Sequence, residues 1–103
     1  MVKTAFLVTG ETGDCGDFRK WSTEVCATAE IAQTRVDFFN ALAAKEGIFQ
    51  DKPNGGKLDL DDFEALDSAT KVLRANGDSM AYADYTGVFY SYRELPFFDQ
   101  LAS

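Results

Sequence analysis

The spacing of apolar residues between Val25 and Ala43 limits the possible folds more than any other feature of the sequence. They recur at intervals of three and four, at Val25, Ala29, Ala32, Val36, Phe39 and Ala43, and Ile31, Phe38 and Leu42 widen this stripe. Such spacing is typical of the buried face of an α-helix. Ser22 suits an N-cap, with Trp21 before it placed to pack on Cys26 as a hydrophobic staple. The pattern therefore predicts a long amphipathic helix ending near Gly47, roughly 35 Å at 1.5 Å per residue.

A second, shorter helix is predicted to begin at Asp59 or Asp61. Its inward face would consist of Phe63, Leu66, Ala69, Thr70 and Leu73. Acids in its first turn and basic residues in its last turn match the helix dipole. Asn76 and Gly77 then close it as a C-cap, because glycine readily adopts positive φ.

Two further segments have the composition of strands. Lys3 to Thr9 is apolar and β-branched and predicts a short strand, which Gly10 ends and a loop over residues 10–16 follows. Val88 to Tyr92 suits a strand equally well, and it would supply the partner that the first strand needs.

The alternative for the C-terminal region is a third helix. Aromatic residues keep helical spacing there, at Tyr82, Tyr85, Phe89 and Tyr92, and Pro96 ends the element in either case. We therefore expect a mainly α protein with one long helix and one or two shorter ones. An α+β fold, in which the N-terminal strand pairs with a C-terminal strand, is the alternative.

Length and composition indicate one small acidic domain spanning residues 1–103. Seventeen acidic residues against ten basic ones give a net charge of −7, which repels nucleic acid and anionic lipid. The longest apolar run near the N-terminus is too short for a signal peptide or a membrane span. We expect a soluble, cytoplasmic protein with no direct binding to nucleic acid or membrane.

The sequence lacks the residues that most often perform catalysis. There is no histidine, and Cys15 and Cys26 form no metal-ligand pair, so zinc and iron–sulfur sites are excluded. Two free thiols are expected, with a disulfide between them as the alternative, and Cys26 is placed in the core of the first helix. No phosphate-binding loop or nucleophile elbow is present. The protein is therefore predicted not to be an enzyme.

One segment, Asp51 to Phe63, resembles the twelve-residue calcium loop of EF-hand and dockerin proteins. The residues in register with the family pattern are Asp51, Gly56, Leu58, Asp59, Asp62 and Phe63. The resemblance implies that calcium, the only cofactor suggested by the sequence, would be bound by Asp51, Asn54, the carbonyl of Lys57, Asp59 and Asp62.

The loop also departs from that pattern. Pro53 and Gly55 stand where the family has side-chain ligands, and Asp62 replaces the usual bidentate glutamate. The same letters have a purely structural interpretation, with a turn at residues 54–56 and an N-cap followed by acids in a first helical turn.

These observations favour a non-catalytic binding or regulatory protein that docks to a protein partner, which its acidity suggests is basic. The proposed contact residues combine acids with aromatics: Asp61, Glu64, Asp67, Tyr82, Tyr85 and Tyr92. Such tyrosines also fill cores. Two alternatives are a weak EF-hand-like calcium-binding protein and an inhibitor that mimics nucleic acid, such as a phage-encoded anti-defence protein.

Overall fold

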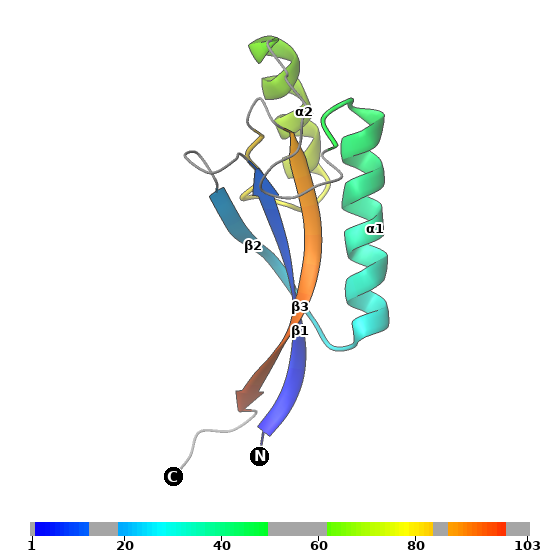
Figure 1. Cartoon of the computed structure of the whole chain (residues 1–103), viewed down its shortest axis with the longest axis vertical. Helices are drawn as coiled ribbons and strands as arrows, with labels where there is room; N and C mark the ends of the chain where they lie inside the picture. Colours follow the sequence, from blue (N-terminus) through cyan, green and yellow to red (C-terminus); the bar gives the residue numbers. More distant parts are fainter. Residues whose placement is uncertain (1, 13–18, 50–61, 84–86, 99–103) are drawn as a thin grey trace.

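The computed structural model describes residues 2–12, 19–49, 62–83 and 87–98, with the backbone alone for residues 2, 3, 97 and 98. The elements follow in the order β1 (Val2–Thr12), β2 (Arg19–Cys26), α1 (Ala29–Lys45), α2 (Phe63–Ala75) and β3 (Val88–Phe98). The strands form one antiparallel sheet in the order β2–β1–β3. Helix α1 lies along one face of this sheet, and α2 packs beside α1 near one end (Figure 1).

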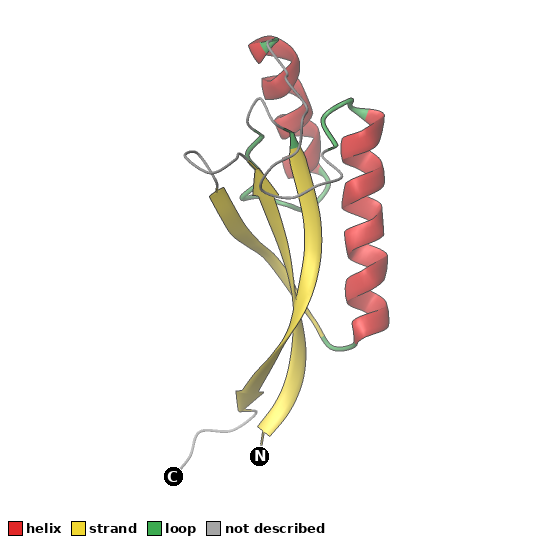
Figure 2. Cartoon of the chain, in the orientation of Figure 1, coloured by secondary structure: helices red, strands yellow, loops and turns green. Residues whose placement is uncertain are grey.

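The fold is α+β, so the expectation of a mainly α, helical protein is wrong (Figure 2). The pairing that the sequence left as the alternative is present, because β1 and β3 are neighbours with Thr9 opposite Ser91. Residues 81–83 form no helix, Phe89 and Tyr92 lie in β3, and Tyr85 lies outside the described residues.

Both paired strands continue past the residues that were expected to end them. Strand β1 runs through Gly10 to Thr12, and β3 runs through Pro96 to Phe98. Proline is accommodated because β3 is an edge strand, where a missing N–H on the outer side breaks no bond of the sheet. Gly10 is required because a Cβ at this position would lie 2.4 Å from the indole of Trp21, its partner on β2.

The first helix begins later than predicted, because residues 19–26 pair with β1 as strand β2. Ser22 is consequently a strand residue, and Thr28 caps α1 by accepting a 3.1 Å hydrogen bond from the Ile31 amide. The 17 residues of α1 span about 25 Å at 1.5 Å each. Val25 is exposed on the sheet, whereas Cys26 is buried at the end of β2 and not within a helix.

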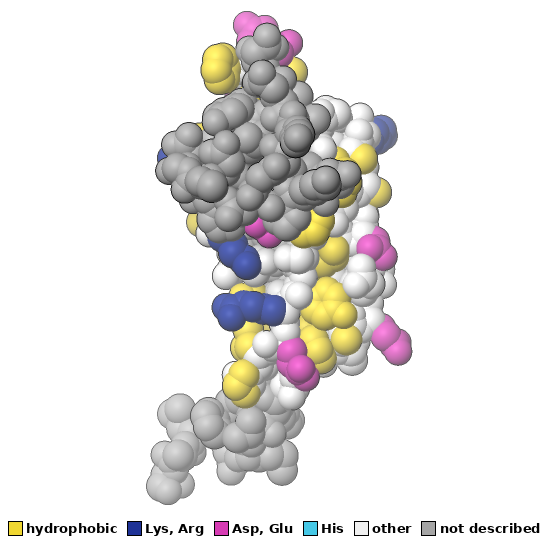
Figure 3. Space-filling view, viewed as in Figure 1, with side chains coloured by type: hydrophobic (Ala, Val, Ile, Leu, Met, Phe, Trp, Pro, Cys, Tyr) yellow, Lys and Arg dark blue, Asp and Glu magenta, His cyan; other side chains and the backbone are white. Residues whose placement is uncertain are grey.

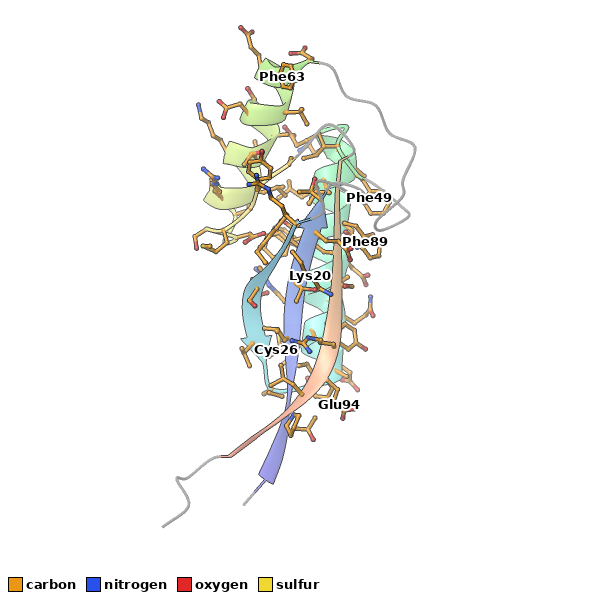
Figure 4. The ribbon with its side chains drawn as sticks, turned by 60° about the vertical axis from the view of Figure 1, so that its left-hand side comes forward. Lys20, Cys26, Phe49, Phe63, Phe89 and Glu94 are labelled. Carbon is orange, nitrogen blue, oxygen red and sulfur yellow. The ribbon has the colours of Figure 1, made fainter. Side chains whose placement is uncertain are left out.

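The core lies between α1 and the sheet. Ala32, Val36, Phe39 and Ala43 are buried, and the ring of Phe39 stacks on Tyr90 with centroids 4.9 Å apart. The ion pair between Arg35 and Glu24 (2.6 Å) ties α1 to β2. No described helix covers the opposite face of the sheet (Figure 4).

Helix α2 matches its predicted face at four of five positions. Leu66, Ala69, Thr70 and Leu73 are buried as expected, and Asn76 with Gly77 (φ +119°) ends the helix. Phe63 is the exception, with 76% of its surface exposed. It is the first residue of α2, one turn away from the part of the helix that is buried.

Candidate functional site

A buried carboxylate occupies the interior between β2, β3 and the turn after α2. Asp78 is fully buried, and its Oδ2 accepts hydrogen bonds from Trp21 Nε1 (2.8 Å) and the Tyr90 hydroxyl (2.6 Å). Burial, together with the hydrogen bond to Asp78 and its charge, raises the pKa of Tyr90 well above its usual value. With no exposed surface, Asp78 cannot meet a ligand, so we assign it to folding.

Sequence reasoning missed this group, because an acid in a turn is usually solvated. A signal was nevertheless present: buried Trp and Tyr side chains need partners for their N–H and O–H groups. Trp21 and Tyr90 carry such groups, and Asp78 is the acceptor that satisfies both.

The candidate site is a hollow beside α2, which we call the α2 hollow. It encloses about 230 Å³ and is lined, within the described chain, by Phe63, Leu66, Asp67, Thr70, Arg74, Tyr82 and Ala83. Phe63 stands at the outer end of α2, away from the sheet (Figure 4). Tyr82 is 39% exposed, so two aromatic side chains border the hollow while open to solvent.

Two arginines fix the wall of the α2 hollow that Tyr82 provides. Arg74 Nε donates a 2.9 Å hydrogen bond to the carbonyl of Ala81, which holds the segment after α2 against the helix. The guanidinium of Arg19 lies 4.7 Å from the centre of the Tyr82 ring, a cation–π contact from β2. The tyrosine is therefore positioned from both sides.

The N-terminus of α2 positions the opposite wall. Asp62 Oδ1 accepts a 3.1 Å hydrogen bond from the Ala65 amide, so Asp62 is the N-cap and Phe63 is the first helical residue. Asp67 lies one turn further on and forms an exposed ion pair with Lys71 (3.0 Å). The rim thus carries carboxylates next to an exposed aromatic ring.

The structure brings together two of the six predicted partner-binding residues. Asp67 and Tyr82 both line the α2 hollow, and Glu64 is exposed on α2 without lining it. Tyr92 lies elsewhere, in a groove between α1 and β3. Asp61 and Tyr85 lie outside the described residues.

That second concavity, the α1–β3 groove, has a volume of about 330 Å³. The described residues lining it come from α1 and β3: Gln33, Val36, Asp37, Asn40, Phe89, Tyr90, Ser91 and Tyr92. At its upper end Phe49 packs near Phe89, with centroids 6.2 Å apart. Asn40 was not singled out from the sequence, yet its amide forms two hydrogen bonds with the backbone of Tyr90.

Most of the predicted calcium ligands lie outside the part of the chain that the structure describes. Asp51, Asn54, Lys57 and Asp59 lie outside the described residues, and Asp62 acts as the helix cap. Among the residues that are described, no group of three or more acids or cysteines is placed to hold a metal ion. Calcium binding stays a prediction.

In comparisons with known proteins, no family model matches the chain, and no curated protein or solved structure shows significant similarity to it. Neither helix that the structure describes is long and apolar enough to cross a membrane.

Proposed function

We propose that this chain is a non-catalytic binding protein that docks to a protein partner through the α2 hollow. The observation that carries the proposal is the exposure of Phe63, an aromatic side chain left in solvent at the border of a concavity. Large aromatic residues dominate the binding energy of protein interfaces when a partner buries them. Met80, 62% exposed, adds apolar surface in the connection after α2.

The charges around the α2 hollow indicate the chemistry of the partner. Glu64 and Asp67 are exposed on the N-terminal half of α2, and Asp62 caps it. Within the described chain, only Asp67 of these three acids forms an ion pair, with Lys71. Arg74 also lines the hollow and Arg19 contacts Tyr82, so the acidic charge is confined to the N-terminal half of α2. A partner that presents an apolar side chain flanked by lysine or arginine would therefore complement both the hollow and its rim.

The experiment uses the full chain as bait in extracts of the cells that produce it. A partner captured by the natural chain would be purified, and its affinity measured for Phe63→Ala and Tyr82→Ala variants. We expect each variant to bind about tenfold more weakly or worse, the usual effect of losing a central aromatic. Val25→Ala is the matched control, because it removes an equally exposed apolar side chain from the sheet.

Thermal melting serves as the control for folding. The melting temperature of Phe63→Ala should be nearly that of the natural chain, because the side chain is exposed. Replacing Glu64 and Asp67 with their amides should weaken binding at low salt and matter less at high salt. A captured partner whose affinity is unaffected by both aromatic variants would refute docking at the α2 hollow.

A further inference from the structure

We propose that the α1–β3 groove is a second interaction site, which binds an extended, basic peptide segment by adding it to the outer edge of β3. The inference is independent of the α2 hollow. It rests on the backbone groups along that edge and on the charges beside it.

The upper part of the β3 edge already has partners from other parts of the chain. The Val88 amide donates to the carbonyl of Ile48 (2.8 Å). Two residues on, Asn40 Oδ1 accepts from the Tyr90 amide (2.8 Å) and Asn40 Nδ2 donates to the Tyr90 carbonyl (3.0 Å). The side-chain amide of Asn40 therefore occupies the place that a peptide group of a neighbouring strand would take.

The lower part of the same edge is open. Alternate residues of a strand direct their N–H and C=O groups to the same side. The backbone N–H and C=O groups of Tyr92 and Glu94 therefore point away from β1, as those of Val88 and Tyr90 do. In the described part of the chain these two residues have no backbone partner on that side. Pro96, the next outward position, has no N–H. Pairing is thus confined to a short stretch of the edge.

The groove beside this edge combines apolar side chains with negative charge. Val36 and Tyr92 contribute its apolar lining, and Asp37 is the only charged residue among the described lining residues. Glu30 lies two turns before Asp37 on the same side of α1, and Glu94 lies on β3. Figure 3 shows acidic side chains around an apolar stretch over α1 and β3, with basic side chains across β3 from that stretch and at the top of α1.

These features select an extended occupant with a definite composition. Unpaired backbone groups on one wall are satisfied by another extended backbone, as in strand addition. Because the side chains of a strand alternate between the two faces of a sheet, every second side chain of that segment would face α1, where the apolar lining and the acids both lie. A segment whose positions facing α1 include both aliphatic residues and lysine or arginine therefore fits the α1–β3 groove.

The test uses a synthetic peptide of about six residues, the usual length of a strand, in which every second residue is threonine and the positions between carry valine and lysine. The full chain is isotope-labelled and titrated with it while backbone amide signals are followed by NMR. We expect saturable shifts at Tyr92 and Glu94 and weaker binding as salt rises. A peptide N-methylated at alternate amides, and one with glutamate in place of lysine, should each bind at least about tenfold more weakly.

Variants of the chain separate backbone pairing from charge. Glu94→Pro removes both the charge and the outward backbone N–H of position 94, whereas Glu94→Gln removes only the charge. We expect the proline variant to bind roughly fivefold more weakly than the glutamine variant, the effect of about one hydrogen bond. Asp37→Asn should weaken binding at low salt, and Asp67→Asn in the α2 hollow should not change it.

The proposal fails if the basic peptide shows no saturable binding at millimolar concentration. It fails equally if the N-methylated peptide binds as well as the parent, or if the shifts centre on Phe63 and Tyr82. Docking at the α2 hollow is judged separately by its own aromatic variants, so failure of one proposal leaves the other standing.

Discussion

The hydroxyl of Tyr90 donates a 2.6 Å hydrogen bond to Asp78, and neither side chain has any exposed surface. Trp21 donates to the same carboxylate oxygen from β2. A single acid therefore joins two strands that are not neighbours in the sheet to the turn that follows α2. Buried polar groups are stable only when they are hydrogen-bonded, so these three residues depend on one another.

Replacing Asp78 should reveal that dependence. Asp78→Ala leaves the partly buried indole N–H and the buried phenol without their acceptor, and we expect a loss of about 2–4 kcal/mol in the free energy of unfolding. Asp78→Asn retains a carbonyl oxygen and should cost about half as much. Urea denaturation measures both, and equal losses for the two variants would contradict a role as acceptor.

Glu11 should make stability depend on pH in the acidic range. Burial raises the pKa of its carboxyl, and Lys20, opposite it on β2, lowers the pKa in part. The folded state then favours the protonated form, so this group costs stability when ionised and ceases to do so as pH falls. Glu11→Gln should stabilise the protein at pH 7.

The gain from Glu11→Gln should shrink as pH falls through the raised pKa and vanish below the ordinary value of 4.5, where the acid is protonated in both states. Thermal melting of both proteins across this range provides the measurement. A destabilised Gln variant at pH 7 would show that the carboxylate makes a favourable contact.

The contact between Gly10 and Trp21 predicts a specific steric effect. Gly10→Ala places a Cβ 2.4–2.7 Å from three atoms of the indole, and we expect a cost of about 1–3 kcal/mol from overpacking. In a Trp21→Phe background the cost should be smaller, which a double-mutant cycle measures. Gly47→Ala is the control: it meets no atom within 4 Å but has φ of +77°, so its cost of about 1 kcal/mol should not depend on Trp21.

Asn40 should protect the edge of β3. Asn40→Ala removes both hydrogen bonds to the Tyr90 backbone, and we expect a loss of about 2 kcal/mol and faster hydrogen exchange at the Tyr90 amide. Asn40→Asp keeps the acceptor and loses the donor, so that amide should stay better protected than in the alanine variant. Unchanged exchange in Asn40→Ala would rule out this protection.

Local patterns predicted those elements whose burial follows a single helical face. The buried residues of α1 and α2, such as Phe39 and Leu73, and the C-cap at Gly77 could be derived from spacing alone. The strand near the N-terminus was also found, although it extends to Thr12. These features are determined by residues that are close together in the sequence, so a short segment is enough to predict them.

The rest depends on contacts between distant segments. Ser22 satisfies the rules for a helix cap, yet it lies in a strand because residues 6–12 of β1 pair with residues 19–26. Phe63 has the spacing of the buried helical face, but it lies about one turn before Leu66, the first buried residue of α2, and is exposed. Of the residues that line the α2 hollow, only Asp67 and Tyr82 were predicted as contact residues, and of those that line the α1–β3 groove, only Tyr92 was.

Among the described elements, the central strand β1 comes first along the chain, and its neighbour β3 comes last. Thr9 meets Ser91 across 82 positions of sequence. On a ribosome, β1 would emerge early and wait with one side unpaired until β3 had been synthesised. Closing so large a loop is entropically costly, so we expect the sheet to assemble late and slowly for a domain of this size.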